Sequence, residues 1–251
     1  MKKMIQGAIG LGAILAMLTC CSKSVEDLQA SGAEKGYATG KIVDADGAGI
    51  AGAKILLDNT MFYGSYIHGT SSEGGTYKIA VQQGSWQTFA YLEKTYNGQT
   101  YTIELFPDKT DSFTEDGGVR NFVWKLEGRM PWEAESYCGG HVELTPDFGF
   151  YEDEQDIEIT LTPSGPLIDG SKGRTLRLSF GHVKWKHRSE LQDIPLGRYT
   201  VTAKLTRSGT SVPLKIDDWH NRNGSETEFQ LDFIPKSTNG GNNSASIVIG
   251  Y

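Results

Sequence analysis

The chain has 251 residues, 31 glycines, 10% aromatic residues and a formal net charge of −7. This length exceeds one small sandwich and suits two domains of about 100–150 residues each. Abundant Gly with frequent Thr, Val and aromatic residues favours strands and turns, and no long helical period follows the first twenty residues. The acidic balance argues against a nucleic-acid partner, because phosphate binding needs clustered Lys or Arg.

An export signal is predicted at the N-terminus. Lys2 and Lys3 precede an apolar run over residues 8–18, which is shorter than the ~20 apolar residues of a membrane-spanning helix. The following Leu-Thr-Cys-Cys, residues 18–21, resembles the lipobox of bacterial lipoproteins, and this resemblance implies that Cys21 carries the lipid. An ordinary secretory leader and a short membrane anchor are the alternatives. Loss of residues 1–20 would lower the formal net charge from −7 to −9.

The next segment, residues 21–35, is small and polar with scattered charge, which predicts a flexible tether. Cys138 is then the one cysteine left in the folded part. A single thiol cannot form an internal disulfide, so packing alone has to stabilise the fold.

A first domain is predicted over residues 36–128. Residues 41–43 and 53–57 flank a turn with Asp44 and Asp46, and we expect them to form a β-hairpin, because Asp and Gly suit reversals. Apolar alternation predicts further strands at residues 76–81, 85–92, 101–105 and 119–126. Short strands separated by turn residues indicate an all-β, antiparallel β-sandwich.

A family resemblance rests on glycines and turn residues in this part of the chain. They are Gly40-x-Ile42-x-Asp44-x-x-Gly47-x-x-Ile50-x-Gly52-Ala53-x-Ile55, Ser71-Ser72-Glu73-Gly74-Gly75-Thr76-Tyr77 and Val81-x-x-Gly84. The pattern resembles the carboxypeptidase regulatory-like domain over residues 37–92. The resemblance implies a transthyretin-like, seven-stranded sandwich of a kind found on bacterial surface proteins, with no catalytic residue to carry over. Gly49 and Ser72 depart from the family, which usually has Pro and Asp at these turn positions.

A second β-sandwich domain is predicted over residues 129–251. Pro131 interrupts strand pairing in the junction, and Gly139-Gly140 permits a bend. Alternation predicts strands at residues 157–161 and 245–251. Residues 191–203 repeat the pattern of residues 77–90, which suggests a weak internal repeat of one hairpin type, with chance similarity as the alternative.

Motifs for catalysis and metal binding give no candidate. The chain has no nucleophile elbow, HExxH, P-loop, GxGxxG or EF-hand loop, so we expect no enzyme activity and no cofactor. His182 and His187 are five residues apart in an expected strand and would face opposite sides. Cys138 and His141 lack the further ligands that zinc needs. The acidic residues of segment 147–156 fit a solvated loop better than a Ca²⁺ site. No metal site is predicted.

Aromatic residues in expected loops are the remaining candidates for ligand binding. A rigid ring with polar neighbours can stack on the apolar face of a sugar. The alternative is core packing, which we expect for Trp86 and Trp124. The candidate binding residues are Trp219, His220, Asn221, Phe148, Phe150, Tyr151 and Trp132.

These features predict a non-catalytic, lipid-anchored protein of the cell envelope, at the outer membrane of a Gram-negative bacterium and on either of its faces. It would bind carbohydrate or serve a glycan uptake or adhesion system. One alternative is a structural or assembly module that binds an outer-membrane partner protein through a sheet edge or an inter-domain groove. Another is a hydrolase with an unrecognised site.

Overall fold

The computed structural model describes residues 32–132, 136–179, 189–236 and 243–251. In these ranges the regular structure is β-strand, apart from the short 3-10 helix η2 (Glu154–Asp156), which confirms the predicted all-β class. No helix in the described part is long and apolar enough to cross a membrane. The predicted leader and residues 21–31 of the tether lie outside the described residues. Glu34, near the end of the predicted tether, contacts the folded part of the chain: its carboxylate accepts a 2.6 Å hydrogen bond from Lys78 Nζ.

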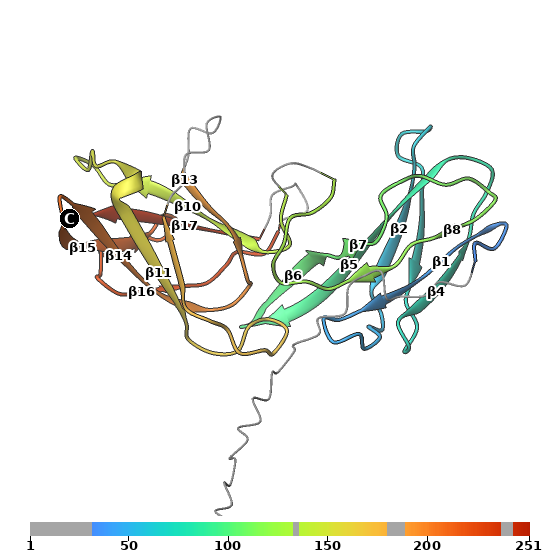
Figure 1. Cartoon of the computed structure of the whole chain (residues 1–251), viewed down its shortest axis with the longest axis horizontal. Coiled ribbons are helices and arrows are strands. Elements are labelled where there is room, and N and C mark those ends of the chain that lie inside the picture. The colour runs from blue at the N-terminus through green and yellow to red at the C-terminus, as the bar shows by residue number, and fades with distance from the viewer. Residues whose placement is uncertain (1–31, 133–135, 180–188, 237–242) are drawn as a thin grey trace, which may run out of the picture.

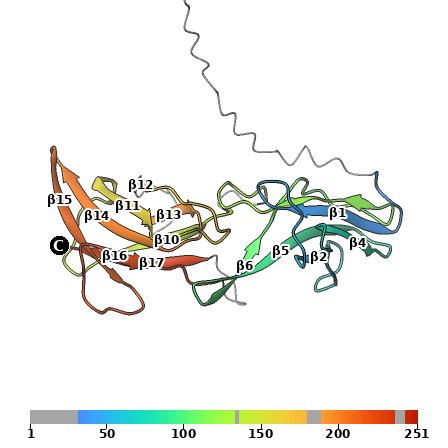
Figure 2. The ribbon, with the colours of Figure 1, turned by 90° about the horizontal axis from the view of Figure 1, so that it is seen from below.

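The N-terminal half forms two facing sheets (Figures 1 and 2). One has the order β4-β1-β9-β7 with β8 beside β1: β1 (Tyr37–Val43), β4 (Thr76–Ala80), β7 (Phe106–Pro107), β8 (Gly118–Val119) and β9 (Phe122–Val123). The other has the order β3-β2-β5-β6: β2 (Lys54–Asn59), β3 (Tyr66–Thr70), β5 (Trp86–Tyr96) and β6 (Gln99–Glu104). The sheets touch closely, since a Cβ placed on Gly69 of β3 would lie 2.4 Å from Ile79 Cδ1 of β4. Trp86 and Trp124 are buried, as predicted for core residues.

The C-terminal half is one continuous sheet path that turns back on itself. The order is β12-β11-β14-β15-β17-β10-β13, with β16 beside β14. The strands are β10 (Gly140–Pro146), β11 (Ile157–Pro163), β12 (Leu176–Ser179), β13 (Ser189–Ile194), β14 (Tyr199–Arg207), β15 (Thr210–Asp218), β16 (Phe229–Leu231) and β17 (Ser244–Gly250). β15 pairs with β14 through residues 210–214 and with β17 through residues 215–218. One long strand therefore belongs to both layers of the sandwich.

Most strand pairs are antiparallel, as predicted, but three are parallel. β1 pairs in parallel with β8 and β9, and β10 pairs in parallel with β17. The expected strand over residues 119–126 is present as two short strands, β8 and β9, separated by Arg120 and Asn121. The Arg120 nitrogen still donates to the Thr39 oxygen of β1, at 2.9 Å, and the side chains of both residues make further contacts. The Asn121 amide nitrogen donates to Asp108 Oδ2 at 2.8 Å, and an Arg120 Nη2 donates to the backbone oxygen of Asp111 at 2.6 Å.

The predicted hairpin over residues 41–57 is wrong, although its turn is correct. Asp44 Oδ1 accepts hydrogen bonds from the backbone nitrogens of Asp46 and Ala48, at 3.0 and 2.8 Å, and Gly47 has φ 87°. The strands on either side do not pair with each other: β1 lies in one sheet and β2 in the other. Alternation specifies which residues form strands but not which strand each one meets.

The proposed repeat is not a pair of hairpins. β4 and β5 lie in different sheets, and β13 and β14 lie at separate positions of the C-terminal sheet path. In both segments the chain leaves one strand for a strand that does not pair with it. The shared pattern, a strand, a turn with Gly and a strand that begins with an aromatic residue, therefore reflects similar local sequence and not a repeated hairpin.

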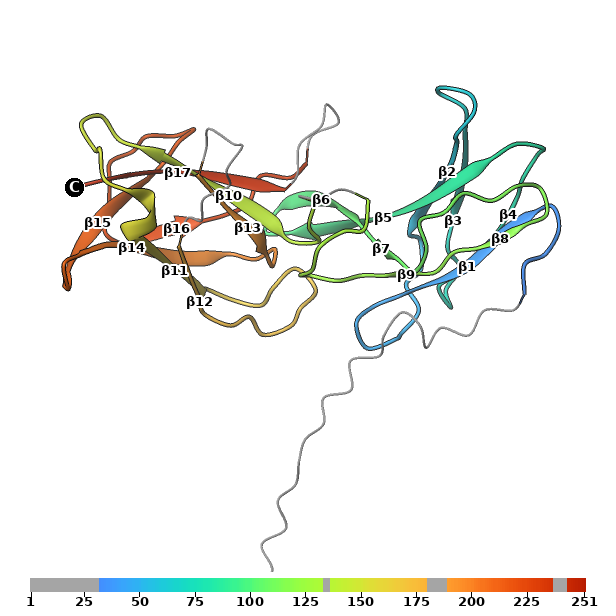
Figure 3. The ribbon, with the colours of Figure 1, turned by 45° about the horizontal axis from the view of Figure 1, so that its top comes forward.

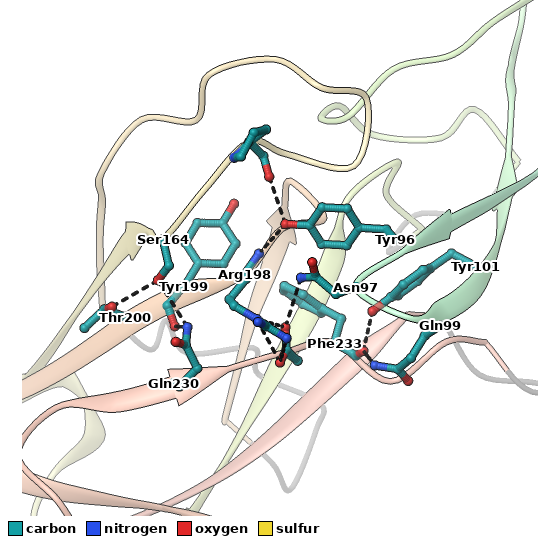
Figure 4. Close-up of polar contacts among 12 residues, drawn as sticks. Tyr96, Asn97, Gln99, Tyr101, Ser164, Arg198, Tyr199, Thr200, Gln230 and Phe233 are labelled. Carbon is teal, nitrogen blue, oxygen red and sulfur yellow. Dashed lines mark hydrogen bonds and ion pairs between the residues drawn. The ribbon is translucent and has the colours of Figure 1, made fainter.

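The β5–β6 hairpin connects the two halves of the molecule. It extends beyond its own sheet toward the C-terminal half and turns at Asn97 and Gly98, both with positive φ (48° and 78°). The Tyr96 hydroxyl donates to the Pro166 oxygen at 2.8 Å and accepts from the Arg198 nitrogen at 3.0 Å. Figure 4 shows these contacts together with the Tyr101 hydroxyl, which donates to the Phe233 oxygen at 2.6 Å.

The same junction has an ion pair and a buried core. Arg198 Nε donates to Asp232 Oδ1 at 2.8 Å and Arg198 Nη2 to Asp232 Oδ2 at 2.8 Å, so the pair is forked. The Asn97 amide nitrogen donates to Asp232 Oδ1 at 3.4 Å. One cluster of buried apolar side chains includes residues from both halves. Burial and the nearby Asp232 carboxylate raise the pKa of Tyr101 to about 12, so its hydroxyl stays a proton donor.

We expect Tyr101→Phe to lower the free energy of unfolding by roughly 1 kcal/mol, because it removes the closer of two donors to the buried Phe233 oxygen, the other being the Gln99 amide at 3.4 Å. Urea denaturation followed by circular dichroism measures this change. Tyr63→Phe is the matched control, since that side chain is fully exposed, and should stay within about 0.5 kcal/mol of the original protein. Equal, small effects in both variants would contradict a stabilising role for the Tyr101 contact.

Candidate functional site

Two loops that are distant in sequence meet at the side of β17. Loop 147–151 follows β10, and loop 219–223 follows β15. Arg222 joins them, because its Nη2 donates to Asp147 Oδ1 at 3.1 Å and its Nε donates to Asp217 Oδ2 at 3.0 Å. β17 lies between β10 and β15 in the sheet, so the Arg222 side chain spans a whole strand.

Each loop is also closed by its own aspartate. Asp147 Oδ1 accepts from the Phe148 nitrogen at 2.9 Å, and the Asp147 backbone oxygen accepts from the Phe150 nitrogen at 3.0 Å. Asp218 Oδ1 accepts from the backbone nitrogens of His220 and Asn221, at 2.6 and 3.0 Å. Short Asp-closed turns of this kind hold the backbone in place and direct the flanking side chains outward.

The carboxylates and Arg222 stabilise each other's charged forms. The hydrogen bond from Arg222 holds the pKa of Asp147 below its ordinary value of 3.8. The hydrogen bonds to Asp147 and Asp217 raise the pKa of Arg222. Asp217 is buried, so Arg222 neutralises a carboxylate that has little access to water. Asp147 and Arg222 therefore both stay ionised through the physiological pH range.

Aromatic side chains stand exposed around this charged centre. Phe148 is 101% exposed, Tyr151 88% and Trp219 50%. His220 and Asn221 are exposed beside Trp219. The structure thus places six of the seven sequence candidates in two loops connected by Arg222, and five of the six are exposed. We call the set Asp147, Phe148, Tyr151, Trp219, His220, Asn221 and Arg222 the aromatic surface.

Two of the sequence candidates are not part of this surface. Phe150 is buried, and its ring packs edge-on against Tyr251 with the centroids 5.2 Å apart. Trp132 is half-buried in the N-terminal half, with its ring centroid 5.0 Å from that of Phe89 on β5. Phe150 is therefore not available to a ligand, because Tyr251 packs against its ring, which no pattern within the loop could show. Trp132 stays a prediction.

Groups suited to metal binding do not assemble in the described part of the chain. No set of three or more His, Cys, Asp or Glu residues there could hold a metal ion. His141 lies 3.8 Å from a Glu143 oxygen, while Cys138 contacts Met130. Burial raises the pKa of the Cys138 thiol to about 11, which keeps it protonated and unreactive. His182 and His187 lie outside the described residues.

Sequence reasoning missed three features that matter here. Arg222 and Asp147 are 75 residues apart, and no local pattern connects them. Tyr251 anchors loop 147–152 by donating its hydroxyl to Glu152, which also pairs with Arg207. The third feature, an exposed Met61-Phe62-Tyr63 run between β2 and β3, had a usable signal: three consecutive large apolar residues between a predicted strand and a Gly.

No protein-family model matches the chain, and no curated protein matches it. The resemblance to carboxypeptidase regulatory-like domains therefore stays a prediction. Among solved structures, the chain is similar to the Bacillus anthracis TIE protein, with 17% identity, a TM-score of 0.29 and coverage of 87% of this chain and 35% of that one. The chain thus spans about a third of the TIE protein.

Two pilus proteins are matched over most of their length. The C-terminal fragment of the pilus adhesin SpaC from Lactobacillus rhamnosus GG is 10% identical, with coverage of 86% of this chain and 97% of that one and a TM-score of 0.23. The major pilin protein T-13 of Streptococcus pyogenes is 9% identical, with coverage of 86% and 96% and a TM-score of 0.24. TM-scores this low do not define a shared fold, so function has to be argued from the residues of this chain.

We expect Arg222→Ala to lower the free energy of unfolding by about 1–3 kcal/mol, because it leaves Asp217 buried without its ion pair. Urea denaturation measures the change. Arg177→Ala is the matched control, since Arg177 is exposed on the edge strand β12, and should stay within about 0.5 kcal/mol.

A second variant separates the ion pair from simple loss of packing. Adding Asp217→Asn to Arg222→Ala removes the unpaired charge and should recover part of the lost stability. A double variant no more stable than Arg222→Ala alone would show that the buried charge is not the cause.

Proposed function

We propose that this chain is a non-catalytic, lipid-anchored protein of the cell envelope that binds carbohydrate through the aromatic surface. The observation that carries this proposal is Arg222, which holds loops 147–151 and 219–223 together and so places Phe148, Tyr151 and Trp219 around one polar centre. Rings held outward by fixed turns provide flat apolar faces at little entropic cost.

The polar groups of the surface fit hydroxyl-rich ligands. Asp147, Asp218, His220 and Asn221 supply acceptors and donors next to the rings. The charged groups of this surface are mainly carboxylates, and its one arginine is already paired. An anionic ligand would be repelled by the carboxylates, so a neutral sugar is favoured.

Anchoring at the outer membrane of a Gram-negative bacterium rests on the lipobox resemblance at Cys21. A role as a structural module that binds a partner protein has one supporting observation. β3 (Tyr66–Thr70) is an edge strand whose residues alternate between exposed and half-buried, so its free side is open to pairing with another chain.

We expect the protein to bind at least one neutral polysaccharide in affinity electrophoresis or on a glycan array. Trp219→Ala should weaken that binding by roughly thirtyfold, since truncating an aromatic hot spot costs about 2 kcal/mol. Tyr63→Ala is the control, an exposed aromatic residue in the other half of the chain. Folded protein that binds no polysaccharide, or equal losses in both variants, would refute carbohydrate binding at this surface.

The lipid anchor is tested separately. Radioactive fatty acid should label the protein in growing bacteria, and Cys21→Ser should abolish the label, because the thiol is the site of attachment. Cys138→Ser is the matched control and should leave the label intact. Label that persists in Cys21→Ser would contradict the anchor at this residue.

A further inference from the structure

The loop between β2 and β3 carries an exposed apolar group that the aromatic surface does not include. Met61 is 67% exposed, Phe62 64% and Tyr63 105%, and Tyr66 at the start of β3 is exposed as well. Single apolar residues on a surface are ordinary, but four neighbouring ones indicate a contact site. Figure 3 shows the β2–β3 hairpin projecting from the body of the N-terminal half.

Hydrogen bonds hold this loop in its outward position. Asn59 is buried, and its Oδ1 accepts from the backbone nitrogens of Met61 and Phe62, at 2.9 and 3.1 Å. The Asn59 backbone nitrogen donates to the Ser65 oxygen at 3.0 Å and closes the loop. Thr60 Oγ1 bonds to Ser85 Oγ at 2.7 Å. The loop therefore already has its outward conformation before any partner binds, and binding loses little conformational entropy in ordering it.

The loop lies at the end of the sandwich where the chain leaves toward its N-terminus. The Gly36 oxygen accepts from the Val81 nitrogen at 2.9 Å, and the Ser85 oxygen accepts from the Thr60 nitrogen at 2.9 Å. Val81 and Ser85 are four residues apart, which limits their separation to about 14 Å. An anchor before residue 32 would thus draw this end of the molecule, loop included, toward the membrane.

The composition of the loop fits lipid better than a charged partner. Residues 59–67 contain no Asp, Glu, Lys or Arg. Met and Phe suit the edge of the hydrocarbon layer, and Tyr is typical of the bilayer interface, where its hydroxyl stays hydrated. The acidic chain has no electrostatic attraction to anionic lipids, so apolar contact has to supply the binding.

We propose that the β2–β3 loop inserts Met61, Phe62 and Tyr63 into the interface of the bilayer on the side of the N-terminal anchor. That the loop faces the membrane rests on the proposed anchoring, whereas its affinity for lipid rests on its own exposed apolar residues. The contact would hold the N-terminal half on the membrane, and the aromatic surface lies in the other half of the chain.

Methionine oxidation tests this insertion in the unaltered protein. Of the methionines after residue 20, Met61 is exposed and Met130 is buried. The full-length protein, purified from the expressing cells, is added to or reconstituted into phosphatidylcholine vesicles and treated with chloramine T, a charged oxidant that bilayers exclude. We expect vesicles to slow sulfoxide formation at Met61 several-fold, as measured by peptide mass spectrometry, and to leave Met130 slow throughout.

Matched variants make the result specific. In Phe148→Met, the introduced thioether lies in the other half of the chain and should oxidise at the same rate with and without vesicles. Phe62→Ser combined with Tyr63→Ser should remove the protection of Met61, while Phe148→Ser combined with Tyr151→Ser should preserve it. A Met61 that oxidises equally fast on vesicles overturns the proposal. So does equal protection at position 148, or protection that grows with protein concentration in the absence of vesicles.

Fatty-acid labelling of Cys21 in the same preparations separates this inference from the proposed function. Labelled Cys21 with a freely oxidised Met61 removes the membrane-contact loop and leaves the anchor. Unlabelled Cys21 with a protected Met61 removes the lipid anchor and leaves the loop contact.

Discussion

The tip of the β5–β6 hairpin is the constraint on which the arrangement of the molecule depends. Tyr96 and Tyr101 carry their hydroxyls out of the N-terminal half, and both bind backbone groups of the C-terminal half. A tyrosine in this position packs its ring at the junction and donates its hydroxyl to a backbone carbonyl of the other half. Because the partners are backbone atoms, the contact depends on how the C-terminal half folds and less on which side chains it carries.

This junction determines where the two exposed aromatic groups lie. The β2–β3 loop belongs to one end of the molecule, and the C-terminus, with Tyr251 beside loop 147–152, belongs to the other (Figure 1). The groups differ in surroundings: the β2–β3 loop has no charged residue, whereas the aromatic surface is built around Asp147, Asp217 and Arg222. An uncharged apolar tip suits a lipid interface, and rings among polar groups suit a hydroxylated ligand. A protein with one contact at each end would connect the membrane to something outside it.

The acidic residues of the chain act largely within the fold. Asp44 and Asp218 each accept from two backbone nitrogens of their own turns. Asp193, which has φ 59°, accepts from the Gly128 and Gly139 nitrogens and so ties β13 to the junction. Carboxylates with backbone donors already in place gain little from a cation, which gives a physical reason why acidic clusters in this sequence do not amount to metal sites.

The alternation of apolar and polar residues, the turn residues and the composition were enough to predict the all-β class and the turn at Asp44. They also predicted the core positions of Trp86 and Trp124 and the loop positions of Phe148, Tyr151 and Trp219. All of these features depend on residues that are close together in the chain. Strand partners could not be predicted in this way: the stretch over residues 41–57 looks like a hairpin, yet its strands belong to opposite sheets. The burial of Phe150 under Tyr251 and the joining of two loops by Arg222 were equally out of reach. Each depends on a partner 75 or more residues away, and only the packing of β10, β15 and β17 side by side brings those partners together.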